Sequence, residues 1–299
     1  MDRVRKKLHA DEVHRAGITG RGVGVAVLDS GLSRHPDYAE RIAGFRDFVN
    51  GKITCYDDAS HGTHVAGILG GDGRQSGGLY RGIAPGCLVV GVKVLDRWGQ
   101  GRLEDLLRAV EWVVRHRHRY GIRILNISAG TSREMEEEAA GRLVSCVEQA
   151  WDAGLVVVVA AGNLGPEPES ITVPGNSKKV ITVGSSDGFD QKPRWGNADY
   201  SGCGPTRECV CKPEFVAPGT EILSCYSRWQ RGTCYTSKSG TSMAAPAVAG
   251  AAALLLESEP ELSNVEVKMR LREAAVDLGL AKQRQGWGMP DLRRLLNGL

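Results

Sequence analysis

The sequence predicts an α/β protein whose mainly parallel central sheet is covered by helices on both faces. Short, continuously apolar segments alternate along the chain with longer segments in which apolar residues recur at helical spacing. Strands that are apolar throughout are typical of a sheet buried on both faces, and the intervening helices supply the crossovers that parallel strands need. No Pro-, Ser- or Gly-rich linker divides the 299 residues, so we expect a single domain over residues 1–299.

Each predicted element follows from its local pattern. Helices are expected where apolar residues repeat every three or four positions, most clearly after Leu103, and strands where the apolar run is short and continuous. The predicted strands are residues 22–28, 88–95, 122–127, 155–160 and 180–183. The predicted helices are residues 10–20, 61–70, 103–118 and 134–153. A last helix, from Ser242 to Leu256, is apolar all round, which is typical of a buried helix.

Composition and charge exclude several classes of function. The 38 Lys and Arg against 35 Asp and Glu give a net charge of +3, too balanced to favour nucleic acid or an anionic membrane as partner. The longest apolar run, Ala244 to Leu256, is shorter than the roughly 20 residues that span a bilayer. Residues 1–10 are charged and lack the apolar core of a secretion signal, so we expect a cytoplasmic protein rather than a secreted one.

The eight cysteines are compatible with a cytoplasmic protein. Five of them lie between residues 203 and 234, and an even count is compatible with disulfides, but reduced thiols are expected in the cytoplasm. A zinc site built on Cys203, Cys209 and Cys211 is disfavoured, because their spacing lacks the paired C-x₂₋₄-C pattern of such sites.

Polar residues that could carry chemistry follow the predicted strands. Asp29, residues 126–130 and Gly162-Asn163 all lie just past strand ends, where parallel sheets bind ligands. Ser242 begins the buried helix, where free N–H groups and the helix dipole favour an oxyanion. Taken alone, Asp29 is equally a turn carboxylate, His61 a capping or core histidine and Ser242 a simple N-cap.

Four segments then carry a family resemblance. They are Val27-Leu-Asp-Ser-Gly31, His61-Gly-Thr-His-Val-Ala-Gly67, Ala160-Ala-Gly-Asn163 and Gly240-Thr-Ser-Met-Ala-Ala-Pro246. They resemble, in order, the signature blocks of the subtilisin-like serine proteases (subtilases, the peptidase S8 family). Residues 80–85, 91–95 and 212–219 look most like the bacterial intracellular alkaline branch. The resemblance covers the chain from about Gly17 onward and implies a three-layer subtilisin-like fold and serine endopeptidase activity.

The resemblance also implies roles for individual residues. Ser242 would be the nucleophile that forms an acyl-enzyme, and His61 its general base and then acid, since a neutral hydroxyl needs a base near pH 7. Asp29 would orient His61, and Asn163 would join the N–H of Ser242 in stabilising the oxyanion. His64 is interpreted as structural, because no Glu follows His61 as in the H-E-x-x-H zinc motif.

Substrate recognition is implied by the same alignment. An extended peptide would lie as an added strand between two segments and would place its P1 side chain in a pocket with small-residue walls. No acidic residue stands at the pocket positions, so a neutral, apolar P1 is expected. The segment that pairs with the peptide backbone and forms one pocket wall is Ser128, Ala129 and Gly130. The strand on the other side of the peptide is Gly99, Gln100 and Gly101. The second pocket wall is Ala160, Ala161 and Gly162, and the pocket base is Thr172.

No cofactor is expected for the chemistry, but the family often binds structural calcium. Asp37 in His35-Pro-Asp37 matches a frequent calcium ligand, although the facing loop, residues 70–79, lacks the family's Asn-rich pattern. Asp57 and Asp58 are candidates for another oxygen-ligand site. The family usually carries a folding prodomain, for which residues 1–20 are too short, so either the chain folds without one in cis or this sequence omits it. The sequence makes no prediction of oligomeric state.

Two alternative hypotheses stay open from the sequence. One is a dedicated intracellular protease that processes a single peptide. The other is a gated or silent scaffold that binds peptides without turnover, which the intact set of Asp29, His61, Ser242 and Asn163 disfavours.

Overall fold

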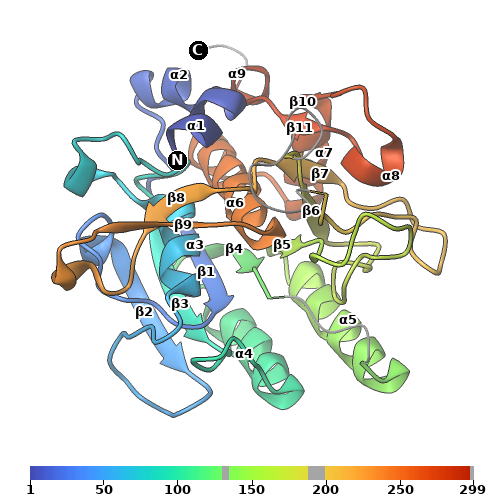
Figure 1. Ribbon diagram of the computed structural model, residues 1–299, viewed down its shortest axis with the longest axis horizontal. Helices are drawn as coiled ribbons and strands as arrows, with labels where there is room; N and C mark the ends of the chain where they lie inside the picture. The colour runs from blue at the N-terminus through green and yellow to red at the C-terminus, as the bar shows by residue number, and fades with distance from the viewer. Residues whose placement is uncertain (130–134, 188–198, 297–299) are drawn as a thin grey trace.

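The computed structural model describes residues 1–129, 135–187 and 199–296, and its centre is a parallel sheet (Figure 1). Seven strands lie in the order β2-β3-β1-β4-β5-β6-β7, and every neighbouring pair is parallel. The α/β prediction is therefore confirmed. The strands are β1 (Gly24–Asp29), β2 (Ile42–Asp47), β3 (Leu88–Lys93), β4 (Ile122–Ile127), β5 (Val156–Ala160), β6 (Ile181–Ser185) and β7 (Phe215–Ala217).

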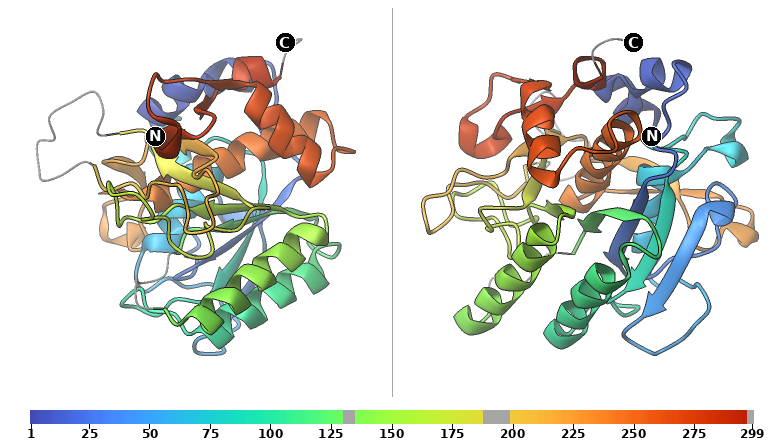
Figure 2. Two further views of the ribbon diagram at one scale, coloured as in Figure 1. Left: turned by 90° about the vertical axis from the view of Figure 1, so that its right-hand side faces the viewer. Right: turned by 180° about the vertical axis from the view of Figure 1, so that it is seen from behind.

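Helices cover both faces of this sheet (Figure 2). Helices α3 (His61–Gly70) and α6 (Thr241–Ser258) pack together on one face, and α4 (Leu103–His116) and α5 (Glu137–Asp152) pack together on the other. Helix α3 connects β2 to β3 and α4 connects β3 to β4, and the chain moves in the same direction along the sheet in both steps, so their places on opposite faces give these two connections opposite hands. The chain leaves β1 toward β2 and leaves β4 toward β5, which are opposite directions along the sheet. The carboxyl ends of β1 and β4 are thus neighbours at the point where the winding reverses, which is where such sheets bind ligands.

Smaller elements surround the sheet. Residues 10–20 were predicted as one helix, which is wrong in extent: α2 (Ala10–Arg15) ends earlier, and α1 (Asp2–Leu8) precedes it. The strands β2 and β7 were not predicted, because β2 is a partly exposed edge strand with Gly44 and Arg46 and β7 has only three residues. The other elements are the hairpin β8 (Ile222–Cys225) and β9 (Tyr235–Lys238), α7 (Asn264–Glu273), β10 (Ala275–Val276), α8 (Lys282–Gln285), β11 (Met289–Pro290), α9 (Leu292–Leu295) and 3₁₀ turns at 39–41, 74–76 and 229–231.

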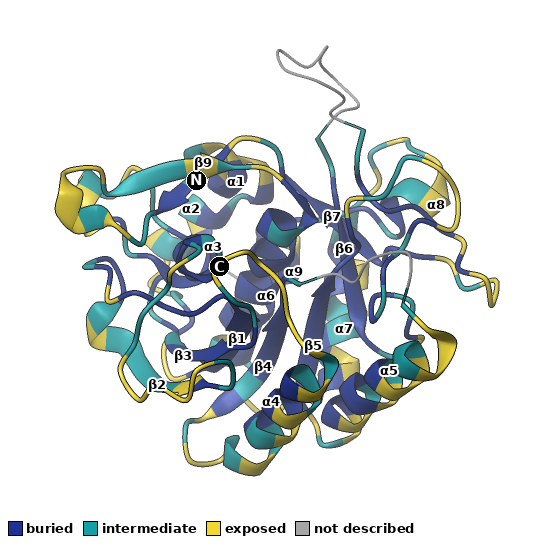
Figure 3. Ribbon diagram, turned by 60° about the horizontal axis from the view of Figure 1, so that its bottom comes forward, coloured by how far each residue is buried: buried dark blue, intermediate teal, exposed yellow. Residues whose placement is uncertain are grey.

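Helix α6 lies in the middle of the buried core (Figure 3). Its length and composition would suffice for a membrane span, but 83% of it is buried inside the protein. Small residues allow this position: a Cβ placed on Gly250 would lie 2.7 Å from the Cβ of Ile83. Protein interiors pack as densely as organic crystals, so this approach leaves no room for a larger residue.

Two helical glycines test this packing. Gly250→Ala should lower the free energy of unfolding by about 1–3 kcal/mol, because the new methyl group overpacks the contact with Ile83. Gly141→Ala is the matched control, since Gly141 lies on the exposed side of α5 with nothing within 4 Å of the added Cβ. That change should stabilise the protein by about 0.5–1 kcal/mol through helix propensity. Urea unfolding of both variants measures the difference, and equal effects would contradict the packing account.

Candidate active site

An aspartate–histidine pair joins the end of β1 to the start of α3. The fully buried Asp29 carboxylate contacts His61 Nδ1 at 2.7 Å through Oδ1 and at 2.9 Å through Oδ2. An ionised carboxylate can only accept, so Nδ1 carries the proton and the Nε2 lone pair is free. Gly62 makes the approach possible, because a Cβ there would lie 2.2 Å from the carbonyl oxygen of Gly31.

The same pair sets the protonation of His61. Burial disfavours the imidazolium, but the charge of Asp29 and its hydrogen bond favour it more strongly, and together they raise the pKa of His61 above 6.5. The ring is still 30% exposed, so its free edge reaches solvent. His61 is therefore placed to gain and lose a proton near neutral pH.

Ser242 is the second residue of α6 and points toward the end of β4. Its hydroxyl donates a hydrogen bond of 2.7 Å to the carbonyl oxygen of Ser128, rather than to His61. The first N–H groups of a helix have no intrahelical acceptor, so the Ser242 N–H is available to a ligand. Catalytic hydrogen bonds often form or tighten only in complexes, and this hydroxyl contact is that of the chain without substrate.

Asn163 is oriented by the residue before Ser242. The backbone N–H of Thr241 donates to Asn163 Oδ1 at 2.9 Å, and the Thr241 hydroxyl lies 3.2 Å from the same oxygen. Because a backbone N–H can only donate, the amide atom facing it must be oxygen, which turns Nδ2 to the other side. The Thr241 hydroxyl also accepts the N–H of Gly162 at 3.1 Å, so this one buried side chain contacts both the backbone of Gly162 and the side chain of Asn163. This role of Thr241 was missed from the sequence, although it stands inside the Gly240–Pro246 motif.

A cleft of about 340 Å³ adjoins His61. Three residues predicted to bind substrate line it, namely Gly99, Ser128 and Ala129, whereas Gly130 lies outside the described residues. The rest of the lining was not predicted from the sequence and consists of Ala59, Leu95, Arg97 and Trp98. Trp98 is 74% exposed, a signal that only the structure provides.

Residues 99–101 do not form the strand that was expected beside the substrate. The segment is a turn in which the Asp96 side chain accepts the N–H of Trp98 and of Gln100 at 2.8 and 2.9 Å. Gln100 and Gly101 are exposed on this turn, and neither is among the cleft-lining residues. The Asp side chain competes for the N–H groups that a strand would offer to its neighbour.

The second predicted pocket wall follows β5. Ala160 ends the strand, Ala161 is buried, and Gly162 adopts a φ of +93°. A Cβ on Gly162 would lie 2.4 Å from Thr172 Oγ1 and Cγ2, so the Thr172 side chain sits directly against this glycine. Thr172 is held there by a hydrogen bond of 2.9 Å from its N–H to the Ala161 carbonyl. The structure thus brings together all four residues assigned to this wall and the pocket base.

Other residues considered as metal ligands have partners within the chain. Asp57 accepts the N–H groups of Ser60 and Thr63, each at 2.8 Å, at the start of α3, and Asp58 pairs with the buried Lys93 at 2.7 Å. His64 Nε2 donates to the carbonyl of Ile222 at 2.8 Å, and burial lowers its pKa to about 3, so it is a neutral structural residue. Among the described residues, the group of potential ligands that gathers is not Cys203, Cys209 and Cys211 but His35, Asp37 and Cys225.

The surroundings of Asp37 do not fit calcium. Calcium takes six to eight oxygen ligands, but the fully buried Asp37 carboxylate instead faces an imidazole and a thiol. Its oxygens already accept the Tyr235 hydroxyl at 2.7 Å and the Gln75 N–H at 3.1 Å.

Comparisons with known proteins place the chain in a family and agree with its fold. Residues 20–288 match the Peptidase S8 model, described as the subtilase family. Serine protease AprX of Bacillus subtilis (strain 168) is 43% identical over 290 residues, which cover 91% of this chain and 66% of AprX, so the chain spans about two thirds of that relative's length. Subtilisin BL of Lederbergia lenta is 35% identical over 91% of this chain and 90% of its own length.

Solved structures give the same result. Sphericase superposes with a TM-score of 0.77 at 30% identity, covering 91% of this chain and 92% of its own. A cold-adapted subtilisin-like serine proteinase gives a TM-score of 0.72 at 29% identity, covering 92% of this chain and 88% of its own.

The Asp29–His61 pair predicts the titration of His61. In a Ser242→Ala background, the NMR titration of His61 should give a pKa above 6.5, and Asp29→Asn should move it below 6.5, because burial is the largest influence and Asp29 supplies the two strongest opposing ones. Asp58→Asn is the control, since Asp58 pairs with Lys93 and should leave the pKa nearly unchanged. An Asp29→Asn value at or above that of the parent would contradict the electrostatic role of Asp29.

Proposed function

The chain belongs to the subtilase family of serine proteases, and from this membership we propose that it is an endopeptidase that hydrolyses peptide bonds through an acyl-enzyme on Ser242. The observation that carries the proposal is the convergence of four groups at neighbouring strand and helix ends. Asp29 holds the proton of His61 on Nδ1, Thr241 turns the Asn163 amide, and Ser242 begins the buried helix α6.

The first half of the reaction uses His61 as a base. The Ser242 hydroxyl leaves the Ser128 carbonyl, turns to His61 Nε2 and attacks the carbonyl carbon of the scissile bond while its proton passes to Nε2. Asp29 stabilises the imidazolium that forms. His61 then returns the proton to the leaving amine, and a water molecule activated by the same nitrogen hydrolyses the acyl-enzyme.

The developing oxyanion is stabilised by two fixed donors. Asn163 Nδ2 points away from Thr241, and the Ser242 N–H opens the first turn of α6, where the helix dipole adds positive potential. Both donors are set before substrate arrives, Asn163 by its hydrogen bond from Thr241 and Ser242 by the buried helix. The transition state therefore costs little reorganisation at this point.

The substrate is a peptide or protein in an extended conformation. Its backbone is proposed to lie along Ser128 and Ala129 in the cleft that Gly99 also lines. Its P1 side chain is proposed to enter between Ala129 and the wall of residues 160–162, which the family resemblance assigns to the pocket. The walls are small and uncharged, and Thr172 limits the depth, which favours a neutral, apolar P1. We also assign the enzyme to a reducing compartment, the cytoplasm, because all eight cysteines are free.

Members of this family need no cofactor for catalysis, and the proposed steps use none. The alternative of a dedicated peptide-processing protease has the same active-site residues and differs only in its substrate. A silent peptide-binding scaffold has less support, because Asp29 and His61 are already arranged for proton transfer.

Covalent labelling tests the proposed nucleophile. A peptidyl phosphonate ester with an apolar P1 should form one adduct on Ser242, located by mass spectrometry, and Ser242→Ala should lose both the adduct and hydrolysis of a peptide library. Ser239→Ala is the matched control, because Ser239 precedes the helix and binds the N–H of Glu221 instead. A missing adduct in the folded chain would overturn the assignment, and adduct formation without turnover would favour the scaffold.

The oxyanion assignment predicts a specific kinetic defect. Asn163→Ala should lower kcat by about 10²–10³ with little change in KM, the loss found for the side-chain donor of a subtilisin. The donor acts mainly in the transition state, so substrate binding is nearly preserved. Asn176→Ala is a comparison at an asparagine outside the site. A KM effect that matches the whole loss in kcat/KM would place Asn163 in ground-state binding instead.

A further inference from the structure

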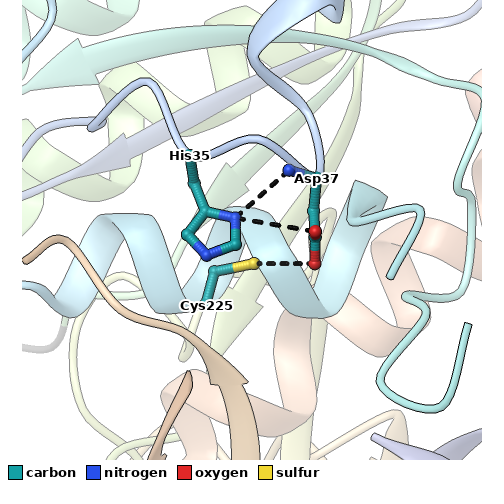
Figure 4. A group of neighbouring side chains, drawn as sticks. All are labelled: His35, Asp37 and Cys225. Carbon is teal, nitrogen blue, oxygen red and sulfur yellow. Dashed lines mark hydrogen bonds and ion pairs between the residues drawn. The ribbon is translucent and has the colours of Figure 1, made fainter. Parts of the chain in front are cut away.

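His35, Asp37 and Cys225 form a buried cluster on the loop after β1 and the end of β8 (Figure 4). All three side chains are essentially inaccessible to solvent. Cys225 Sγ lies 3.7 Å from Asp37 Oδ2, and His35 Nδ1 lies 3.9 Å from Asp37 Oδ1. One ligand atom from each residue falls within 4.8 Å of the other two. The proposed peptidase chemistry uses none of these groups.

The imidazole turns its unprotonated nitrogen toward the cluster. His35 Nε2 lies 2.9 Å from the carbonyl oxygen of Cys234, to which it must donate, and Nδ1 accepts the N–H of Asp37 at 3.2 Å. The proton is thus on Nε2, and a metal ion at Nδ1 would take the place of this long hydrogen bond from Asp37. A second nitrogen that donates to a backbone carbonyl is the usual orienting contact of a metal-bound histidine.

The negative charge of the Asp37 carboxylate is not neutralised by a Lys or Arg side chain among the described residues. Within the described ranges, the buried Asp37 carboxylate forms no ion pair with Lys or Arg. The guanidinium of Arg41 binds the backbone carbonyl of Asp37 instead. A buried charge is costly unless it is paired or coordinates a metal. One divalent cation would neutralise a carboxylate and a thiolate together.

We propose that His35 Nδ1, the Asp37 carboxylate and the Cys225 thiolate bind one Zn²⁺ ion, with water as the fourth ligand. Nitrogen, sulfur and carboxylate oxygen are the ligands that zinc prefers, and calcium takes oxygen alone. Ligand atoms about 2.0–2.3 Å from a tetrahedral zinc lie roughly 3.5 Å apart. The three ligand atoms here lie within 4.8 Å of one another, so zinc would draw the side chains together on binding. On binding, the Cys225 thiol loses its proton to solvent, and the ion links the hairpin β8–β9 to the loop of residues 35–37.

Metal titration tests the site in the full chain, reduced, stripped of metal, and carrying Ser242→Ala to prevent self-digestion. Cys209→Ser and Cys211→Ser are included to remove the exposed thiols. Zn²⁺ added in competition with a chromophoric chelator should bind at one equivalent. Co²⁺ should give thiolate-to-metal charge-transfer absorption. Cys225→Ser and His35→Gln should each weaken Zn²⁺ binding more than about 100-fold, beyond the effect of losing an outer-shell contact.

Cys87→Ser is the matched control, because Cys87 is an equally buried thiol outside the cluster and should retain one equivalent. Unchanged Zn²⁺ affinity in folded Cys225→Ser would overturn the proposal, as would binding of Ca²⁺ in place of Zn²⁺. If Cys225→Ser does not fold, as circular dichroism would reveal, Cys225→Ala and the Co²⁺ spectrum of the parent decide. Absence of a charge-transfer band that depends on Cys225 and survives Cys87→Ser would then reject the site, whatever the outcome for peptidase activity.

Discussion

The structure depends on the burial of helix α6 against the sheet and α3. Only small residues allow a helix to be covered on every side, and Gly250 meets Ile83 with no space for a methyl group. This packing fixes the N-terminus of α6 at the carboxyl ends of the strands. Ser242 and Thr241 are therefore positioned by the core itself, and Asn163 is positioned by Thr241. The small apolar residues of α6, which take no part in the chemistry, thus determine where the residues of the candidate site lie.

Two buried aspartates near the end of β1 show how surroundings decide chemistry. Asp29 meets His61 at 2.7 Å and raises its pKa, so the pair shares a proton and a charge that a reaction can use. Asp37 meets an imidazole whose proton faces the other way and a thiol, and it forms no ion pair with Lys or Arg in the part of the chain that the structure describes. The first arrangement suits proton transfer and the second suits a metal ion, although Asp29 ends β1 and Asp37 lies on the loop that follows it.

The sequence allowed the parallel sheet, the main helices and the residues of the candidate active site to be predicted, because apolar runs and short motifs are local signals. It did not reveal β2 or β7, whose stability comes from neighbouring strands rather than from their own composition. Residues 99–101 were predicted as a strand, but the Asp96 side chain accepts the N–H groups of Trp98 and Gln100 and forms a turn, a contact that the sequence pattern does not indicate. Cys225 meets Asp37 across 188 positions of the chain, a distance over which no spacing rule operates.

Ser242, His61 and Asn163 are expected to act together on the scissile carbonyl group of one substrate. A crystal structure of the full chain with a peptidyl boronic acid tests this most directly. The account predicts boron bonded to Ser242 Oγ, which has left the Ser128 carbonyl, with one boronate oxygen about 2.7–3.1 Å from both Asn163 Nδ2 and the Ser242 N–H. The other boronate oxygen should face His61 Nε2. Boron bonded elsewhere, or Asn163 turned with its oxygen toward the boronate, would contradict the account.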